Sequence, residues 1–591
     1  MTAATEWGWS AWAWLVIPLA VYGLCSLTLF AFGRTDETNP LRFFFGQIGD
    51  TLQRITGYPG WSMAGVLSGL IMLLVAVIGF YWDVAWHVDN GRDNELFTPS
   101  HVMILVGLGG LIYAAAIATL FASLEKADVG LKAGPLRVPW SAVLLASLGL
   151  GGVAAFPLDA MWHDAYGVDV TLWSPPHIQL VAGGSLATIA LWLMASEGRR
   201  AANEPLLLGR FIHALAAGTV LVGMSTLQAE FDFGVPQFQA LYLPIIVMIA
   251  AGFTLVGTRL ALGPWGAVKV TAYYLGLRTF LAIAVGPALG HTVPRFPLYL
   301  GSALLVEAVA WRLGTERPLR LAVAAGAVVG TVGLATELVW VSLWGFTTDL
   351  PLAFVLKIAL LGPAAAVAAA VVGAALGSTI ASTRERIPLA ALGAAGVAIL
   401  AALAYPFPRA VGPVTATVRL QQVGSLANVE VVLDPPTAAS RATAFAVTSW
   451  QGGAPTVRAS LEGVGPGRYV SSRPMPVTGS WKTLVSLQRG DEVMAVPVYL
   501  PADPEIGAPE VPAVPERTER FVRNTTLLLR EVRPGPAGAA VAAYTGLAVL
   551  VAIWIGLIGV AARRIPPPSP PSDGWSTARP PAKVRVAPST L

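Results

Sequence analysis

Long apolar runs are the feature that most constrains how this chain can fold. About thirteen of them are long enough to cross ~30 Å of hydrocarbon as a helix. They cover residues 11–32, 61–82, 101–123, 138–158, 177–196, 210–228, 240–260, 268–289, 297–313, 320–345, 351–378, 387–405 and 538–562. Of the 591 residues, 55% are hydrophobic and only 12% are charged, which is too apolar for a soluble domain. The sequence therefore predicts a polytopic α-helical membrane protein with about 13 transmembrane helices.

The charges in the loops predict the orientation of these helices. Lys and Arg gather in one alternate set of loops, as at Arg199 and Arg200, whereas the other set up to residue 350 carries little beyond Arg92 and Arg295. Because cytoplasmic loops are enriched in Lys and Arg, we expect a multi-pass protein of the cytoplasmic (inner) membrane. Its N-terminus would lie outside and its C-terminus in the cytoplasm. The first run lacks a basic leading region and a clear cleavage site, so we interpret it as a retained helix.

A different pattern begins after the twelfth run. Short alternating segments such as Val414–Leu420, Val429–Leu433 and Val493–Tyr499 are separated by Gly, Pro and Asp. This pattern is typical of a small antiparallel β-sandwich, which the loop charges place outside the membrane. The turns at Gly465–Tyr469 and Gly479–Trp481 resemble those of the copper-chaperone-like sandwiches of the YtkA, FixH and CopC type. The segment contains no His and no Cys, so we expect a docking or lid role rather than a cupredoxin-type copper centre.

These patterns divide the chain into six parts. They are 1–60 (first transmembrane helix and inner loop), 61–196 (a duplicated hairpin region), 197–405 (the remaining transmembrane bundle), 406–537 (the extracytoplasmic β-sandwich), 538–562 (the last transmembrane helix) and 563–591 (a Pro/Ser-rich cytoplasmic tail). A tail of this composition is expected to be disordered.

Two groups of metal-ligand residues have the same spacing, D-x3-H-x13-H. The first triad is Asp83, His87 and His101, and the second triad is Asp159, His163 and His177. Framing residues repeat as well, including Trp86 with Trp162 and Pro99 with Pro175, and the two triads hold four of the six histidines in the chain. An Asp and a His four residues apart share one face of a helix. Each triad therefore predicts two imidazoles and one carboxylate converging from a helical hairpin.

Such a donor set suits copper, zinc or ferrous iron, and the Irving–Williams order favours copper. The competing interpretation is that each residue is a helix cap or an interfacial side chain. Ionisable groups at membrane depth are costly and usually functional, so matched spacing favours metal ligation. We expect Asp93 and Asp169 to support the histidines from the second shell. Glu230 and Asp232 follow the sixth run at the outer face and would belong to the second shell or to an access funnel for cations.

Other polar residues have alternative interpretations. His291 at the outer face is either a third-site ligand or an interfacial residue, and His213 at the inner side is expected to be structural. Charged residues also lie within the later runs, and opposite charges on neighbouring spans predict internal ion pairs. The expected pairs are Arg278–Glu307 or Glu337–Lys357.

The first triad also resembles a known family. Asp83-Val-Ala-Trp-His87, Arg92-Asp93 and Phe97-Thr-Pro-Ser-His101 are similar to the metal-binding segment in the C subunit of membrane-bound copper monooxygenases, the particulate methane and ammonia monooxygenases. The resemblance covers residues 83–101 and implies that the first triad binds one metal near the membrane surface. Three features depart from the family: the longer second spacer, the duplication, and a longer chain with its own outer β-domain. Methane or ammonia oxidation is therefore not carried over.

Two classes of function remain. The first is an oxidoreductase, a copper-dependent monooxygenase subunit acting on a small apolar substrate; the second is copper acquisition, storage or delivery at the outer face. A structural zinc clasp joining the hairpins is a third interpretation, and iron or zinc is the alternative to copper. No Walker loop occurs in the sequence, which disfavours an ATP-driven pump. No C-x-x-C-H haem attachment motif occurs either. We expect membrane lipid as a partner and no nucleic acid, and leave open additional membrane subunits or a homo-oligomer.

Overall fold

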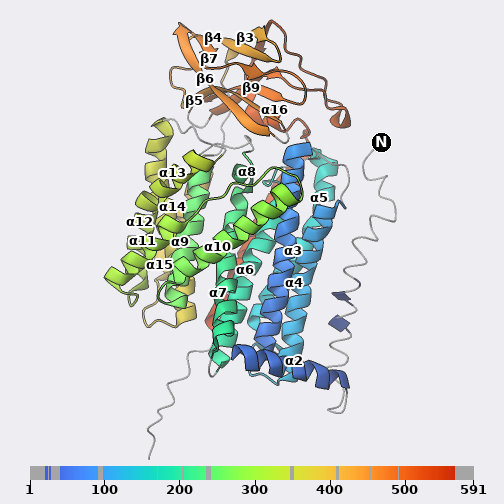
Figure 1. Ribbon diagram of the computed structural model, residues 1–591, viewed down its shortest axis with the longest axis vertical. Coiled ribbons are helices and arrows are strands. Elements are labelled where there is room, and N and C mark those ends of the chain that lie inside the picture. The colour runs from blue at the N-terminus through green and yellow to red at the C-terminus, as the bar shows by residue number, and fades with distance from the viewer. Residues whose placement is uncertain are drawn as a thin grey trace, which may run out of the picture.

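The chain folds into a helical bundle with a separate β-domain at one end (Figure 1). A computed structural model describes residues 20, 22–23, 26–27, 40–90, 97–168, 171–202, 205–234, 241–345, 352–406, 412–451, 454–489 and 492–565. Within these residues, ten helices are long and apolar enough to cross a membrane. This confirms the predicted class, a polytopic helical membrane protein with a β-domain.

The spans follow the predicted apolar runs closely. In chain order they are α3 (Gly60–Asn90), α4 (Pro99–Leu124), α5 (Trp140–Tyr166), α6 (Pro175–Ala201), α7 with η2 and α8 (Leu207–Asp232), α9 (Tyr242–Leu262), α10 with η3 (Gly266–Ala288), α12 with η4 and α13 (Pro318–Trp344), α14 (Leu352–Ala381) and α17 (Ala537–Arg564). Two expected spans are shorter helices, α11 (Leu300–Leu313) and α15 (Leu389–Ala404). The first expected span, 11–32, lies largely outside the described residues. The predicted number of about thirteen is thus an approximation.

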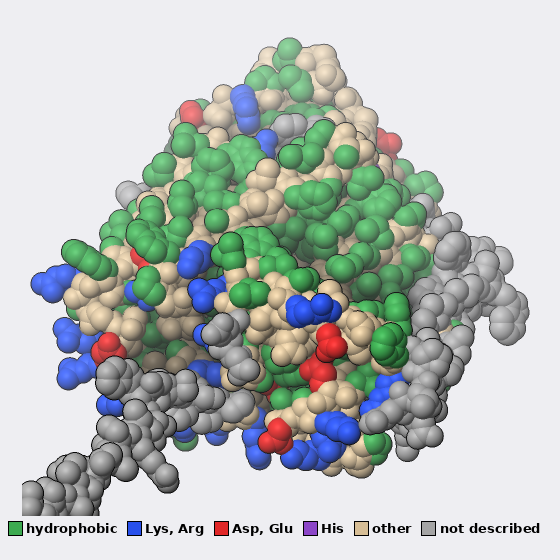
Figure 2. All heavy atoms as spheres, turned by 60° about the horizontal axis from the view of Figure 1, so that its bottom comes forward, with side chains coloured by type: hydrophobic (Ala, Val, Ile, Leu, Met, Phe, Trp, Pro, Cys, Tyr) green, Lys and Arg blue, Asp and Glu red, His purple; other side chains and the backbone are tan. Residues whose placement is uncertain are grey.

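The two ends of the bundle differ in charge. Helix α2 (Pro40–Thr56) lies across the end opposite the β-domain, where a short hairpin of β1 (Leu131–Ala133) and β2 (Leu136–Val138) joins α4 to α5 (Figure 1). Figure 2 shows Lys and Arg side chains gathered around this end, below the apolar flank of the bundle. The distribution agrees with the loop pattern of the sequence. The orientation and the choice of membrane stay predictions.

Glycines bring the hairpin helices together at matched positions. A Cβ at Gly107 of α4 would lie 2.6 Å from the Met72 carbonyl oxygen of α3, and one at Gly183 of α6 would lie 3.1 Å from the Leu148 carbonyl oxygen of α5. Small residues at such contacts allow close helix packing within a membrane, where the hydrophobic effect does not drive helices together. The repeated glycines therefore hold α3 against α4 (the first hairpin) and α5 against α6 (the second hairpin), which fixes the helix ends that carry the two triads.

The β-domain is an antiparallel sheet folded around its own core. Its strands are β3 (Thr415–Val423), β4 (Leu426–Asp434), β5 (Ala444–Gln451), β6 (Ala454–Gly465), β7 (Arg468–Ser471), β8 (Met475–Pro476), β9 (Lys482–Arg489), β10 (Glu492–Tyr499), β11 (Glu516–Arg520) and β12 (Val522–Arg523). Their order is β11-β3-β4-β7-β6-β5-β9-β10-β12, with β8 beside β4. Inward side chains of both halves, such as Val418, Val431, Val447 and Val485, share one buried cluster. This packing of two faces matches the predicted sandwich.

Buried charges in the later helices pair differently from the sequence expectation. The Nη2 atom of Arg278 lies 2.5 Å from Asp232 Oδ2, and the Nε atom of Arg259 lies 2.6 Å from Glu307 Oε2. The expected Arg278–Glu307 pair is therefore wrong. Spacing along the chain could not reveal the true partners, because Asp232 and Arg259 come from helix ends that only the tertiary fold brings close.

The second expected pair, Glu337–Lys357, is also wrong. Glu337 accepts hydrogen bonds from the backbone N–H groups of Leu298 and Tyr299, where α11 begins. The ammonium of Lys357 lies 5.7 Å from the centre of the Tyr405 ring. Because the first N–H groups of a helix have no partner within it, a nearby carboxylate stabilises the helix start. Glu337 therefore acts as a helix cap supplied from another helix.

Candidate metal centre

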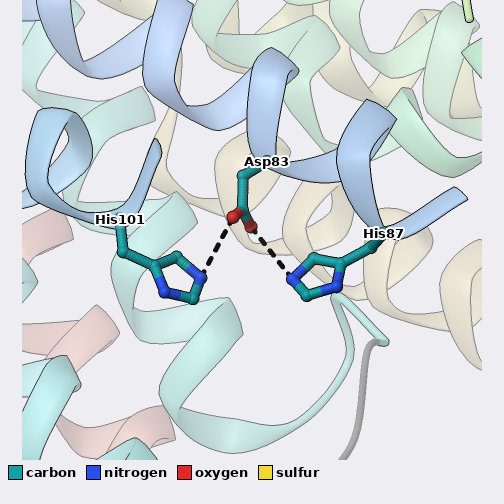
Figure 3. A group of neighbouring side chains, drawn as sticks. All are labelled: Asp83, His87 and His101. Carbon is teal, nitrogen blue, oxygen red and sulfur yellow. Dashed lines mark ion pairs between the residues drawn. The ribbon is translucent and has the colours of Figure 1, made fainter. Parts of the chain in front are cut away.

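The first triad lies at the end of the first hairpin that faces the β-domain. Asp83 and His87 lie one turn apart near the end of α3, and His101 lies in the first turn of α4 (Figure 3). The carboxylate lies between the two imidazoles, with His101 Nε2 3.0 Å from Asp83 Oδ1 and His87 Nε2 3.7 Å from Asp83 Oδ2. All three side chains are less than one-fifth exposed. The structure thus brings together the three residues that the spacing selected.

The start of α4 positions two members of this triad. The side chain of Thr98 caps the helix by accepting a hydrogen bond from the N–H of His101, and Pro99 follows at the first helical position. Ser100 Oγ donates to Asp83 Oδ1 at 2.8 Å. A proline at this position has its φ angle preset for the helix and lacks only an N–H that would be unpaired. The Thr-Pro-Ser-His sequence therefore both starts the helix and fixes the carboxylate.

The second triad repeats this geometry on the second hairpin. Asp159 and His163 lie on α5 and His177 lies in the first turn of α6. Asp159 Oδ1 is 3.5 Å from His163 Nε2 and 3.3 Å from His177 Nε2. The ring centres of its histidines are 6.0 Å apart, compared with 6.1 Å in the first triad. The sequence duplication thus repeats the convergence of the three side chains, although the ring planes meet at 77° rather than 40°.

The two triads differ in the groups that support them. Pro176 occupies the position of Ser100, so this position offers no hydroxyl to Asp159. The Oγ atom of Ser174, which replaces Thr98, has no hydrogen-bond partner among the described residues. Instead, the Nδ1 atom of His177 lies 2.5 Å from the backbone carbonyl oxygen of Thr171. The first triad is thus held through its carboxylate and the second through a histidine.

The Thr171 contact fixes how His177 presents its other nitrogen. A carbonyl oxygen can only accept, so Nδ1 of His177 must carry the hydrogen. In a neutral ring Nε2 then holds a lone pair, and this atom faces the Asp159 carboxylate oxygen at 3.3 Å. A lone pair and a carboxylate repel unless a proton or a cation lies between them. Metal-binding histidines typically donate their second N–H to a carbonyl or carboxylate in this way.

The donor atoms of each triad are close enough to share one ion. In both groups, one ligand atom from each residue lies within 4.8 Å of the others. Metal–ligand bonds to nitrogen and oxygen of about 2.0–2.2 Å place two donors on the same ion roughly 3–4 Å apart. A contraction of at most roughly 1–2 Å would therefore complete either site. The two imidazoles and one carboxylate leave further coordination positions open and suit several transition metals.

The two triads are neighbours. The ring of His101 lies 6.5 Å from that of Phe156, centre to centre, and Phe156 precedes Asp159 by one turn of α5. Both groups lie at the same end of the bundle, on helices α3 to α6 (Figure 1). A change of charge in one triad will therefore be felt in the other.

The other acidic residues predicted around the site differ from one another in where they lie and in what they contact. Asp93 and Asp169 lie outside the described residues. Glu230 accepts a hydrogen bond from the backbone N–H of Leu172, in the loop of the second hairpin, and so supports the segment that precedes His177. Asp232 is buried against Arg278, and this pairing neutralises the charge that a cation funnel would use.

The remaining histidines have polar partners. Nδ1 of His291 lies 3.0 Å from Asp89 Oδ2, and Thr292 donates to the same carboxylate through its backbone N–H. Asp89 lies two residues after His87, so this contact anchors the end of α3. At the far end of the bundle, buried His213 contacts the hydroxyl groups of Tyr58 and Ser196. This supports the structural role expected for His213.

The connection from the β-domain to α17 packs on the second hairpin. The backbone N–H of Arg533 donates to the Tyr166 carbonyl, and the Tyr544 hydroxyl donates to the Trp173 carbonyl. The Trp162 ring stacks on Tyr166 with centres 4.1 Å apart. The duplicated tryptophan thus joins a contact with the C-terminal part of the chain. The sequence pattern could not predict it, because the partners are more than 360 residues apart.

Searches against family models, curated proteins and solved structures found no match to this chain. The resemblance of residues 83–101 to the copper monooxygenase C subunits therefore stays a prediction.

Proposed function

We propose that this chain is a membrane-embedded copper protein with two neighbouring metal sites. The first triad would bind one ion and the second triad another. The contact between His177 and the Thr171 carbonyl carries the proposal, because it turns the Nε2 lone pair toward the Asp159 carboxylate. The same three residue types converge in the first hairpin. With Nδ1 of His177 donating to Thr171, its Nε2 atom can face the carboxylate favourably only across a proton or a cation, and a bound metal ion would supply that cation.

Copper is the favoured ion. Donor sets of two imidazoles and one carboxylate bind divalent metals in the Irving–Williams order, which peaks at copper. The one cysteine of the chain, Cys25, belongs to neither triad, so neither is a thiolate site of the kind typical of structural zinc. Copper bound there would supply one-electron redox chemistry at a position with open coordination.

The surroundings favour an oxidoreductase that acts on a small apolar substrate. Phe80 lies one turn before Asp83 on α3, and Phe156 lies beside His101. Aromatic and aliphatic walls of this kind bind apolar molecules and exclude water from reactive groups. The similarity of residues 83–101 to the metal segment of the copper monooxygenases points in the same direction. We therefore infer monooxygenase-type chemistry without assigning the substrate of that family.

Copper acquisition, storage or delivery is the second candidate. It is favoured by the position of both triads at the end of the bundle that carries the β-domain (Figure 1). A delivery protein must release its ion to a partner, whereas a redox enzyme must retain it through turnover. The rate of copper loss to a chelator, and copper-dependent oxygen consumption with an apolar substrate, would separate the two functions.

Metal analysis of the purified protein tests the proposal. We expect about two copper ions per chain after loading, because each site holds one ion between three ligands. The His87→Ala/His101→Ala variant should retain the second ion and the His163→Ala/His177→Ala variant the first. The variant with all four substitutions should bind none. Copper content that is unchanged in this last variant would refute both sites.

A His213→Gln variant is the matched control. It removes an imidazole at the opposite end of the bundle, where the ring contacts Tyr58 and Ser196. Glutamine can still hydrogen-bond to both hydroxyl groups. We expect full copper content in this variant. Substrate turnover that persists in metal-free protein would exclude a copper-dependent oxidoreductase, but would leave copper handling as a possible function.

A further inference from the structure

We propose that the bundle binds, directly beneath the metal sites, a medium-chain alcohol: an elongated hydrocarbon with one hydrogen-bonding oxygen. The binding site is a cavity of about 430 Å³ between α3, α4, α6, α7 and α10. This volume lies in the range of small-molecule pockets. As a substrate site the cavity rests on the proposed function, but the binding itself requires no metal.

The cavity wall determines the apolar character of the ligand. Its lining side chains include Leu73, Phe80, Ile104, Leu108, Leu180 and Val222, and the few polar ones are hydroxyl-bearing residues. Charged side chains are absent from this lining. A charged or strongly polar ligand would lose its hydration there without gaining partners. A hydrocarbon chain would instead gain contacts along the whole wall.

The position of the cavity links it to the triads. Phe80 lies one turn before Asp83 on α3, Ile104 one turn after His101 on α4, and Leu180 one turn after His177 on α6. Residues three apart share a helix face, and one turn advances about 5.4 Å. Three helices therefore place the outer end of the cavity roughly one turn below ligand residues of both triads.

The opening of the cavity indicates where its ligand comes from. Ile71 and Leu74 of α3 line it and are 57% and 38% exposed on the flank of the bundle. In a membrane, this flank faces the hydrocarbon of the lipid. A ligand that dissolves in the bilayer can enter sideways at these residues, without crossing the β-domain or the loops.

One hydroxyl group determines the polar part of the ligand. Ser185 of α6 lines the cavity, its side chain is nine-tenths buried, and its Oγ has no hydrogen-bond partner among the described residues. Its neighbour Thr188 differs, because the Thr188 hydroxyl donates to the Ser185 backbone carbonyl. A buried hydroxyl without a partner is unfavourable. The Oγ atom is covered in this structure, so a rotation about χ1 would bring it to the cavity surface, where an alcohol oxygen would satisfy it.

The depth of Ser185 suggests a length for the ligand. Ser185 follows His177 by eight residues of α6, which corresponds to about 12 Å along the helix axis. A molecule whose oxygen contacts Ser185 therefore points its hydrocarbon end toward the metal sites. The length of the hydrocarbon chain must therefore match this distance of about 12 Å, which selects a medium-length chain rather than a gas or a full-length phospholipid.

The test is photolabelling of the full chain in lipid nanodiscs with a diazirine derivative of 1-decanol. We expect labelled peptides from α3, α6 and α7, and competition by free 1-decanol that is stronger than competition by decane. One hydrogen bond of typical net strength corresponds to about a fivefold difference between the two competitors. In Ser185→Ala the two should compete equally. Equal competition in the unmodified protein would refute the role of Ser185 and with it the alcohol.

Two glycine variants test the cavity itself. A Cβ at Gly184, in the cavity wall, would meet only Leu108 at 3.7 Å, so Gly184→Leu fills the space without disturbing the backbone. The control, Gly276→Leu on α10, adds the same side chain at an exposed helical position with no atom within 4 Å. We expect labelling to fall on the order of tenfold in Gly184→Leu, because the added side chain excludes the ligand. It should be unchanged in Gly276→Leu, and undiminished labelling in Gly184→Leu would overturn the proposal.

The metal sites and the cavity can fail separately. Labelling is measured in metal-free protein and again in the variant with all four triad histidines replaced by alanine. If both label as the unmodified protein does while no copper binds to any form, the cavity stands and the copper function falls. If copper binds as proposed but neither Gly184→Leu nor Ser185→Ala changes the labelling or its competition, the copper function stands and the cavity proposal falls.

Discussion

Replacing Ser100 should weaken the first metal site selectively. Its hydroxyl is buried and donates to Asp83 Oδ1 at 2.8 Å, whereas Pro176 occupies the matching position in the second hairpin. A hydrogen bond to a charged group contributes about 1.5–3 kcal/mol. Since about 1.4 kcal/mol is a factor of ten, Ser100→Ala should lower copper affinity roughly 10- to 100-fold.

The measurement is a competition titration with a copper chelator on one site at a time. Ser100→Ala is compared with its parent in the His163→Ala/His177→Ala background, which retains only the first triad. The reciprocal substitution Pro176→Ser, in the His87→Ala/His101→Ala background, should tighten the second site by up to about tenfold because it supplies the missing hydroxyl. The pair of variants thus exchanges the supporting groups of the two copies.

Ser174→Ala provides the matched control. Its Oγ has no hydrogen-bond partner among the described residues, so its removal should leave both affinities unchanged. The reasoning would be refuted if Ser100→Ala left the first site unaltered, or if it weakened the second site equally when introduced into the His87→Ala/His101→Ala background. The second outcome would mean that the substitution acts through helix packing rather than through Asp83.

Three further predictions follow from the contacts around the site. Arg278→Met leaves buried Asp232 without its partner and should lower the free energy of unfolding, measured by thermal unfolding in detergent, by about 3–5 kcal/mol. The double variant Arg278→Met/Asp232→Asn removes the unpaired charge and should be more stable than Arg278→Met; equal stability of the two variants would contradict this explanation. Gly167→Ala places a Cβ 2.1 Å from the Glu531 carbonyl oxygen, at a φ of 89°, so the linker before α17 should become more sensitive to limited proteolysis, whereas unchanged cleavage would argue against this contact. Copper at about 100 times its Kd should stabilise the folded chain by about 2.7 kcal/mol and so raise its Tm, and a chelator should reverse this rise. A Tm that is unchanged by copper would exclude binding to the folded state.

Much of the architecture could be predicted because membrane helices obey simple length and polarity rules. The ten spans coincide with predicted apolar runs, and strands such as β4 and β10 coincide with predicted alternating segments. The triads could be predicted for a related reason. Within a helix, four residues make one turn, so Asp83 and His87 must lie together, and the hairpin brings the next helix start beside them.

The partners of the buried charges could not be predicted in this way. Arg278 and Asp232 are 46 residues apart and meet only because α8, at the end of the span that begins with α7, lies beside α10. The supporting group of His177 leaves no trace in the sequence, because a backbone carbonyl belongs to every residue. Ser100 did carry a signal, since Thr-Pro-Ser-His is a helix start with a spare hydroxyl, but its contact with Asp83 depends on the neighbouring helix.

The chain returns to the bundle from the β-domain along one hairpin. Arg533 and Tyr544 hold backbone carbonyls that flank His163 and His177, while the described part of the first hairpin is tied down by His291 instead. A mechanical load on the β-domain would thus act directly on the backbone of the second hairpin. The two copies of the unit are therefore braced differently, and displacement of the β-domain should act first on the segment between His163 and His177.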